Sequence, residues 1–212
     1  MIPHASTPST SSIPARKGLR RRAAVLSLLP LTSLAALVLP TPQEAKAELS
    51  SSQDFTTTAS GLKVLKVRDG KPGTRAPRPG DRISVHWSGF TAGYRQHILD
   101  NTSQRDEPFE WVLGSGEAIP AFEEAVMNMR PGGLVRVELP GDRMEELGYS
   151  LDRQRRFSKG FTYAVGPQPQ DFGGKRALDF VLDNKTFDNS PFNRTLVFDI
   201  ALLAVYPGQG ST

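Results

Sequence analysis

The stretch that most constrains the fold is RDEPFEWVLGSGEAIPAFEEAVMNM, residues 105–129. Phe109 and Trp111 alternate with polar residues, which is the period of a half-buried strand. A glycine-rich turn then ends the strand, and Pro120 suits the first position of a helix. Because the strand and the helix follow each other so closely, their apolar faces must meet. This corner is either a closing hydrophobic core or the lining of a pocket.

The helix is predicted from the residues that follow Pro120. Glu123 and Glu124 complement the positive N-terminal end of a helix. Apolar side chains recur at steps of three and four residues, which gives the helix one buried face. These side chains are Ile119, Phe122, Val126 and Met129. The sequence Pro-Gly-Gly at 131–133 ends the helix.

Strands are predicted on both sides of this helix. Apolar and polar residues alternate in RISVHWSGF (82–90), in FEWVL (109–113) and in LVRVELP (134–140). The segment TLVFDIALLAVY (195–206) is long, apolar and rich in β-branched residues, so we expect it at the centre of a sheet. The order of elements predicts an α+β domain, with an antiparallel β-sheet wrapped over one short α-helix.

A long insert interrupts this order before the last strand, at residues 150–191. A connection of this length in a compact domain is usually functional or a separate excursion. One fragment, Ala177 to Val181, fits either a short helix or a short strand. We predict that the insert is not needed for folding, because the strands and helix are complete without it. Loop length itself costs only ~0.6 kcal/mol per doubling.

The first 47 residues have the composition of a targeting sequence. No Asp or Glu occurs in residues 1–43, where arginines precede an apolar run at 23–39 and a small-x-small exit at 45–47. These are the parts of an export signal, and the run is shorter than the ~20 residues that span a bilayer. We predict cleavage after Ala47 and no stable membrane anchor. A retained single-span anchor is the alternative.

The leader also indicates a compartment. Its paired arginines resemble a twin-arginine signal, and the Ser/Thr/Pro-rich start before them resembles a plastid transit peptide. Together they predict the chloroplast and then the thylakoid lumen, with a bacterial periplasm as the alternative. We expect residues 48–60 to be a flexible or sheet-edge lead-in, 61–206 to be the domain, and 207–212 to be a tail.

Composition excludes several classes of function. Of the 26 basic and 22 acidic residues, six and one lie before Glu48, which leaves 20 − 21 = −1 for the rest of the chain. No basic stripe remains to bind nucleic acid. The chain has no cysteine, which excludes disulfides, thiolate chemistry and soft metal sites.

Motifs for metal, cofactor or nucleophile chemistry are incomplete. The histidines His4, His86 and His97 lack ligand spacing. Gly-Ser-Gly at 114–116 lacks the outer glycine of a nucleophile elbow and the third glycine of a dinucleotide loop. We therefore expect no metal and no cofactor.

What remains is a group of aromatic residues with one carboxylate and no nucleophile. Such a site suits a reaction in which no covalent bond is made. Rotation about an X-Pro amide is one, because its barrier of ~18–20 kcal/mol comes from resonance that separates charge. A dry apolar pocket disfavours the charge-separated form, and fixed donors favour the twisted transition state.

Three segments resemble the FKBP family of peptidyl-prolyl isomerases, which bind tacrolimus and rapamycin. They are GDRISVHWSGF, ILDNTSQRDEPFEWVLGSGEAIPAFEEAVMNMRPGG and NRTLVFDIALL. The resemblance covers about residues 61–149 and 191–206, and with the leader it is most similar to thylakoid-lumen FKBPs. It implies catalytic positions at Trp87, Asp100 and Tyr149. It implies substrate-binding positions at Leu99, Phe109, Trp111, Ala118, Ile119, Phe122 and Phe198.

The resemblance also implies the polar surroundings of the pocket. Arg105 is the expected partner of Asp100. Glu117 and the backbone of 118–119 form the expected rim that hydrogen-bonds ligands, and a wall residue is expected near Ser190. The long insert is the main departure from the family pattern.

Two substitutions relative to the family affect the pocket chemistry. Leu99 stands where Phe is usual, and it offers less flat surface to a proline ring. Trp87 stands where Tyr is usual, and its indole N–H is a donor only. We predict that this N–H donates to the Asp100 carboxylate.

Alternatives remain for the site and for the function. From spacing alone Phe109, Trp111, Ile119 and Phe198 read as core, and Asp100 reads as a turn cap. The first functional hypothesis is an isomerase for proline-containing lumenal proteins. The second is a weak or inactive binding module that holds an assembly partner, such as a subunit of a photosynthetic complex.

Overall fold

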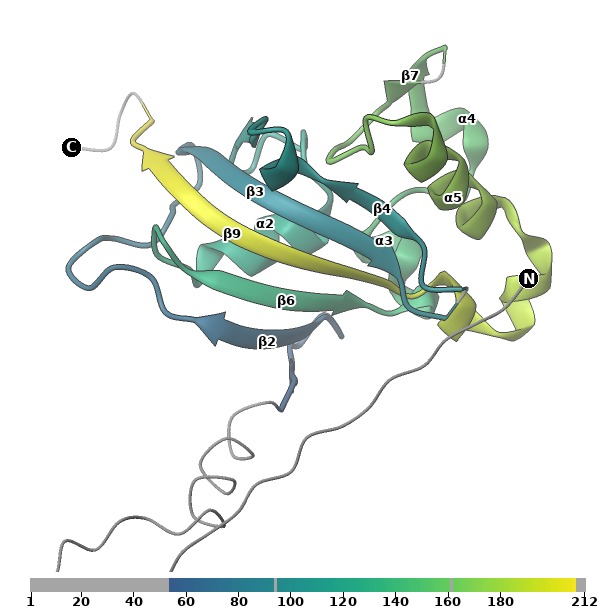
Figure 1. Ribbon diagram of the computed structural model, residues 1–212, viewed down its shortest axis with the longest axis horizontal. Coiled ribbons are helices and arrows are strands. Elements are labelled where there is room, and N and C mark those ends of the chain that lie inside the picture. Colours follow the sequence, from purple (N-terminus) through teal and green to yellow (C-terminus); the bar gives the residue numbers. More distant parts are fainter. Residues whose placement is uncertain (1–53, 94, 161, 209–212) are drawn as a thin grey trace, which may run out of the picture. The chain divides into compact units, whose positions relative to one another are not determined.

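Figure 1 shows the computed structural model, in which residues 54–93, 95–160 and 162–208 are described. The predicted targeting sequence at 1–47 lies outside these residues. The described chain forms a seven-stranded sheet with strand order β1-β2-β6-β9-β3-β4, and β5 pairs with β3. The strands are β1 (Thr56–Thr57), β2 (Lys63–Arg68), β3 (Arg82–Thr91), β4 (Ile98–Asn101), β5 (Phe109–Val112), β6 (Leu134–Leu139) and β9 (Leu196–Tyr206).

The sheet is antiparallel at every strand pair, and the strands predicted from alternation are confirmed. β9 lies between β3 and β6, as its long apolar sequence predicts. Short β1 covers one edge by pairing with β2, so part of the expected lead-in at 48–60 forms the sheet edge.

One helix, α2 (Pro120–Met127), packs against one face of the sheet (Figure 1). Pro120 begins the helix, as predicted, because the missing N–H of proline has no intrahelical partner at that position. The buried face is made by Ala121, Phe122, Ala125 and Val126. The prediction of an α+β fold with a sheet over one short helix is thereby confirmed.

The insert is folded rather than irregular. It contains α4 (Arg153–Arg156), the two-stranded ribbon of β7 (Phe157–Lys159) and β8 (Thr162–Tyr163), and α5 (Phe172–Asp183). Two short 3-10 helices, η3 (Lys185–Asn189) and η4 (Pro191–Arg194), lead back to β9. Figure 1 shows α4, α5 and β7 gathered at the end of the sheet beyond β4. The fragment 177–181 is therefore helical.

The prediction that the core is complete without the insert is wrong. Leu178, Val181 and Leu182 of α5 are buried in the same apolar cluster as the sheet and α2. They lie at steps of three and four residues, a helical face that neighbouring glycines and charges hide in the sequence. Tyr163 of β8 is buried there as well.

Arg156 holds the insert together from within. Its side chain is 1 % exposed and lies 2.7 Å from Asp183 and 3.3 Å from Asp179, both on α5. The guanidinium also donates to the Ser150 and Leu151 carbonyls. A buried guanidinium is tolerated only with such partners, so α4 and α5 are fixed to each other.

Three further short helices follow the sheet strands: η1 (Thr102–Gln104) after β4, and η2 (Gly141–Arg143) and α3 (Met144–Leu147) after β6. Within the described ranges, no helix is both long enough and apolar enough to cross a membrane.

Candidate functional site

The floor of the site is a cluster of edge-to-face aromatic rings from three elements. Trp87 of β3 lies with its ring centroid 6.3 Å from that of Phe122 on α2 and 6.0 Å from that of Phe198 on β9. The Phe122 and Phe198 centroids are 5.2 Å apart. Such pairs stabilise beyond their buried area, so the floor is rigid.

Gly89 makes this close packing possible. A Cβ atom at position 89 would lie 2.9 Å from the Phe198 ring and 2.9 Å from the Trp87 ring. Gly89 also faces Asp100 across the β3–β4 pair. The missing side chain at position 89 leaves room for the Trp87 and Phe198 rings.

Phe109 and Trp111 of β5 extend the aromatic surface. Their rings stack with centroids 5.1 Å apart and an interplanar angle of 20°. Trp111 also meets Phe122 edge-on at 6.5 Å. Among the described residues the buried Trp111 indole N–H has no hydrogen-bond partner. Phe109 is half-buried and is the exposed end of this stack.

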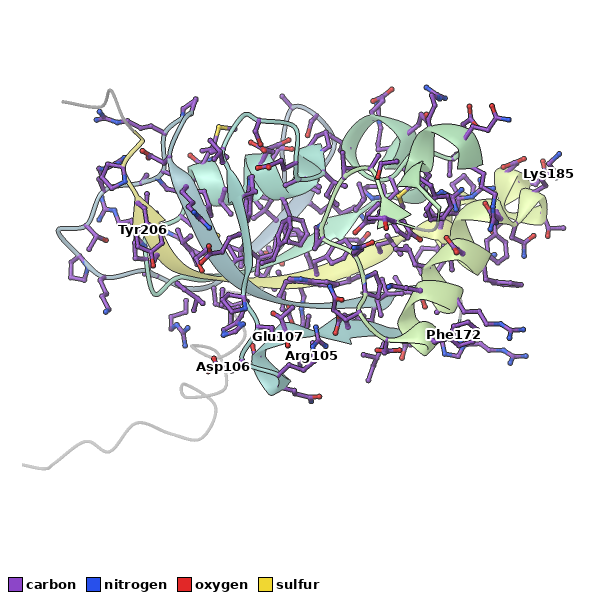
Figure 2. The ribbon with its side chains drawn as sticks, turned by 90° about the horizontal axis from the view of Figure 1, so that it is seen from above. Arg105, Asp106, Glu107, Phe172, Lys185 and Tyr206 are labelled. Carbon is purple, nitrogen blue, oxygen red and sulfur yellow. The ribbon has the colours of Figure 1, made fainter. Side chains whose placement is uncertain are left out.

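Asp100 is a buried carboxylate with four N–H donors. Arg105 binds both of its oxygens, through Nη1 and through Nη2 at 3.1 Å. The backbone N–H of Asn101 donates at 2.7 Å and that of Gln170 at 3.0 Å. Figure 2 shows Arg105 near Glu107 at one edge of the domain, where Glu107 accepts from the guanidinium at 3.1 Å.

The pKa of Asp100 follows from this set of donors. Burial alone would raise the pKa of the carboxyl, but the Arg105 guanidinium and then the Gln170 and Asn101 amides outweigh it. The pKa of Asp100 is therefore below its ordinary value, and the pKa of Arg105 is raised by the same contact. The site holds a fixed, ionised carboxylate.

The predicted hydrogen bond from Trp87 to Asp100 is wrong. Within the described chain the donors to Asp100 are Arg105, Asn101 and Gln170, and the Trp87 indole is not one of them. The indole packs instead against Phe122 and Phe198. The expected Arg105 contact is present, and a backbone amide of the insert supplies the remaining donor.

The rim of the site is occupied by an internal segment, residues 163–170, which we call the strap. The Ile119 N–H donates to the Gly166 carbonyl at 2.7 Å, and the Gly166 N–H donates to the Glu117 carbonyl at 2.7 Å. These bonds make a parallel bridge between Ala118 and Gly166. The strap thus lies along the rim that was expected to bind ligands.

Tyr149 takes part in the same contact. It is fully buried, which raises the pKa of its phenol, and its hydroxyl donates to the Pro167 carbonyl. Its ring meets that of Tyr163 edge-on at 5.5 Å. Tyr149 thus lies beside the strap, to which its hydroxyl donates.

A cavity of about 330 Å³ lies between floor, rim and strap. Seven of its 14 lining residues belong to the strap. The others are Trp87, Thr102, Arg105, Glu107, Pro108, Phe109 and Glu117. This volume lies at the lower end of the range for small-ligand sites.

The structure sorts the predicted residues by role. Trp87 and Phe109 line the cavity, while Asp100, Tyr149 and Ile119 bond to the strap. The others lie in the buried core and do not line the cavity: Leu99, Trp111, Ala118, Phe122 and Phe198. Ser190 is not the wall residue, because it is exposed between η3 and η4 and the strap forms the wall.

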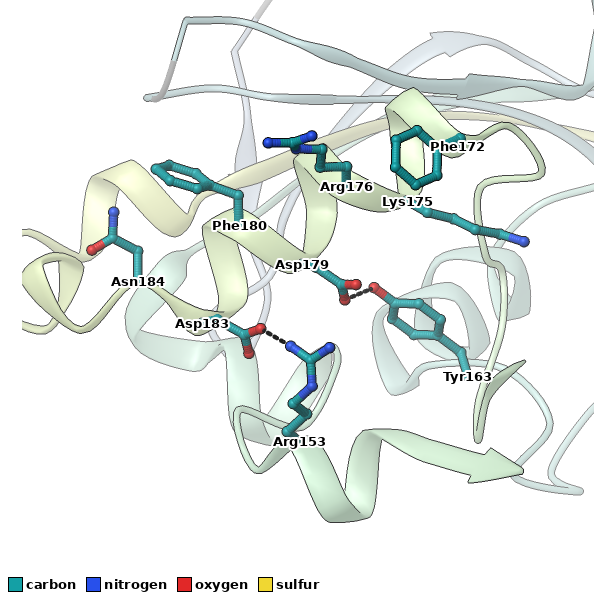
Figure 3. Close-up of a pocket in the computed structure, with 9 residues that line it drawn as sticks. All are labelled: Arg153, Tyr163, Phe172, Lys175, Arg176, Asp179, Phe180, Asp183 and Asn184. Carbon is teal, nitrogen blue, oxygen red and sulfur yellow. Dashed lines mark hydrogen bonds and ion pairs between the residues drawn. The ribbon is translucent and has the colours of Figure 1, made fainter. Parts of the chain in front are cut away.

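A larger cavity of about 750 Å³ lies on the insert (Figure 3). It is lined by residues of α5 together with Arg153, Tyr163 and Asn184. Four of its polar side chains are paired with one another: Arg153 with Asp183 at 2.5 Å, and the Tyr163 hydroxyl with Asp179 at 2.7 Å. The aromatic floor and the ionised Asp100 are elsewhere, so we assign the site to the smaller cavity.

Sequence reasoning missed the strap. Its local signal is GPQPQ at 166–170, in which two prolines favour an extended chain. Nothing in that signal indicates which part of the fold the segment covers. The pairing of Gln170 with Asp100 joins residues 70 positions apart.

Comparison with known proteins shows which protein family this chain matches. The family model described as FKBP-type peptidyl-prolyl cis-trans isomerase matches residues 73–203. Two curated chloroplastic peptidyl-prolyl cis-trans isomerases of Arabidopsis thaliana are similar. FKBP19 is 39% identical over 163 residues, or 73% of this chain and 57% of that protein. FKBP17-1 is 29% identical over 194 residues, or 87% of this chain and 75% of that protein.

Among solved structures, FkpA from Escherichia coli is similar with 25% sequence identity and a TM-score of 0.45. The match covers 78% of this chain and 57% of FkpA. The chain thus spans little more than half the length of FKBP19 and of FkpA.

Proposed function

Because this chain belongs to the FKBP-type peptidyl-prolyl cis-trans isomerase family, we propose that it catalyses rotation about X-Pro amides in protein clients. The observation that carries the proposal is the aromatic floor of Trp87, Phe122 and Phe198, extended by stacked Phe109 and Trp111. Trp87 and Phe109 line the cavity with the other three rings packed against them, and Asp100 holds the lining residue Arg105. No nucleophile is required for this chemistry.

The chemistry follows from the amide itself. A planar X-Pro amide is stabilised by resonance that places charge on the carbonyl oxygen. An apolar enclosure disfavours that charge more than it disfavours the twisted, less polar transition state. The Ile119 N–H at the rim supplies a fixed donor for a substrate carbonyl, and Asp100 keeps Arg105 in place.

The compartment that we propose is the thylakoid lumen of the chloroplast. Support comes from the leader, which has no Asp or Glu in residues 1–43 and carries the arginines and the small-residue exit, and from the chloroplastic names of FKBP19 and FKBP17-1. Lumenal proteins with X-Pro bonds are the proposed clients, including subunits of photosynthetic complexes, and tacrolimus or rapamycin are proposed ligands. Intact mass of protein recovered from isolated lumen tests this, and a species that retains residues 23–39 contradicts it.

A second candidate function is a non-catalytic binding module. The observation in its favour is the strap, which uses the hydrogen-bonding groups of the rim. In that case the insert, rather than the pocket, holds an assembly partner. The two candidates differ in whether a short X-Pro peptide is turned over.

The test is a prolyl isomerisation assay on residues 48–212 with a short X-Pro peptide. Phe109→Leu should lower kcat/KM by about tenfold, which corresponds to ~1.4 kcal/mol of transition-state stabilisation. Phe172→Leu is the matched control, because Phe172 lies outside the site and is 77 % exposed. Absence of turnover in the parent and both variants would favour the binding module.

A further inference from the structure

The strap makes four hydrogen bonds to the site, and all four use the strap's main-chain atoms. The Gly166 carbonyl accepts from the Ile119 N–H, and the Gly166 N–H donates to the Glu117 carbonyl. The Pro167 carbonyl accepts from the Tyr149 hydroxyl, and the Gln170 N–H donates to the Asp100 carboxylate. A bound peptide offers the same main-chain donors and acceptors. The polar groups suited to bind a ligand are therefore used by the chain itself.

The strap also fits the site sterically. Gly166 lies against the exposed end of the aromatic stack, where an added Cβ would lie 2.7 Å from Phe109 Cζ and 2.8 Å from Cε2. The parallel bridge with Ala118 pairs the backbone of the strap with the rim, and main-chain pairing of this kind is a common mode of peptide binding. Pro167, the next residue, is buried.

No ion pair holds the strap in the site. Residues 163–170 are Tyr-Ala-Val-Gly-Pro-Gln-Pro-Gln, without a charged side chain. The insert on either side of the strap is held by charged groups: buried Arg156 pairs with Asp183 on α5, and the Tyr163 hydroxyl at the start of the strap donates to Asp179 on α5 at 2.7 Å. An incoming peptide can replace the strap's hydrogen bonds one for one while the rest of the insert stays folded.

We propose that the strap is an internal competitor for the proline site, so that external proline-containing segments bind only when the strap leaves. The inference deepens the proposed function and rests on it, because the competing ligand is the isomerase substrate. When the strap occupies the site for most of the time, the apparent affinity for a peptide falls by the fraction of open molecules. Opening the strap is then a point of regulation.

The test adds one methyl group to the strap in the full chain. Gly166→Ala introduces a Cβ against Phe109, and Gly173→Ala adds the same group to α5, outside the site. Both are compared with the parent for kcat/KM and Kd with a tetrapeptide that has one Ala–Pro bond. Strap release is followed by acrylamide quenching of the only two tryptophans, Trp87 and Trp111, which are buried at the site.

Gly166→Ala should increase quenching, tighten peptide binding and raise kcat/KM by about tenfold, the gain for a site that is open one-tenth of the time. Gly173→Ala should resemble the parent. Tighter binding of the peptide to Gly166→Ala without turnover in any variant supports the strap and contradicts the isomerase function. Increased quenching with unchanged or weaker peptide binding overturns the proposal that the strap competes with the peptide.

If the Phe109 ring moves aside in Gly166→Ala and quenching stays unchanged, the proposal is tested instead by hydrogen exchange in the parent protein. Saturating Ala–Pro peptide should then speed hydrogen exchange of the Gly166 and Gln170 amides, since both lose their acceptors. A peptide that binds while both amides stay protected overturns the proposal.

Discussion

The sheet-and-helix core and the insert are built by different means. The core consists of paired strands whose apolar residues alternate, with α2 packed on one face. The insert has one two-stranded ribbon and is held by buried Arg156 and by the apolar face of α5. The core supplies the aromatic floor of the site, and the insert supplies its wall and one donor to Asp100. A region without a clear sequence pattern can thus complete a site whose floor is evident from the sequence.

The largest expected effect tests whether the insert belongs to the core. Leu178→Ala should lower the free energy of unfolding by about 3 kcal/mol, because Leu178 is fully buried and its loss leaves a cavity. Leu203→Ala is the matched control, with Leu203 43 % exposed on β9. Urea denaturation measures both variants. Equal, small losses would mean that α5 is an appendage after all.

The next effect concerns how the insert is held. Arg156→Leu should cost about 3 kcal/mol, since it leaves Asp179 and Asp183 without their buried partner. Arg155→Leu removes an exposed arginine paired with Asp152 and Glu145, and should cost less than about 1 kcal/mol. Urea denaturation measures the free energy of unfolding of both variants. A loss for Arg156→Leu no larger than that for Arg155→Leu would contradict the role given to Arg156.

The difference between the regions also explains what the sequence could predict. The strands and α2 follow from period and from residue type, and the structure has them where expected. Spacing alone indicates a core for Phe109, Trp111 and Phe198, and only the family resemblance indicates a site there. The strap does not follow from period or residue type, because its contacts are main-chain bonds between residues far apart, such as Gln170 and Asp100. The predicted hydrogen bond from Trp87 to Asp100 failed for a related reason. Spacing shows on which face of the strand the Trp87 side chain lies, but it does not show which N–H groups bind the Asp100 carboxylate.

A smaller effect, on pH dependence, tests the junction between the regions. The pKa of Asp100 is lowered in the folded state, so its contribution to stability is present above the ordinary value of 3.8 and is lost as pH falls through the lower, folded-state pKa. Asp100→Asn should therefore lose less stability than the parent between pH 5 and roughly pH 2. The pKa of Asp81 is also lowered, and its contribution to the pH dependence of stability is the same in the parent and in Asp100→Asn.

Asp106→Asn is the control for that measurement, because the Asp106 side chain is 99 % exposed. Its unfolding free energy should fall with acid in parallel with that of the parent. If Asp100→Asn also runs parallel to the parent, the Arg105 and Gln170 contacts do not stabilise the ionised carboxylate.

The central claim is that proline-containing segments bind on the floor made by the core, beneath the strap. Only two indole N–H groups exist in the chain, those of Trp87 and Trp111, and both belong to that floor. We would titrate ¹⁵N-labelled protein with an Ala–Pro tetrapeptide and follow the two indole signals. The account predicts that both signals shift with one common Kd. Peptide binding by calorimetry with both indole signals unmoved would place the site elsewhere, such as the α5 cavity of Figure 3, and would contradict the claim.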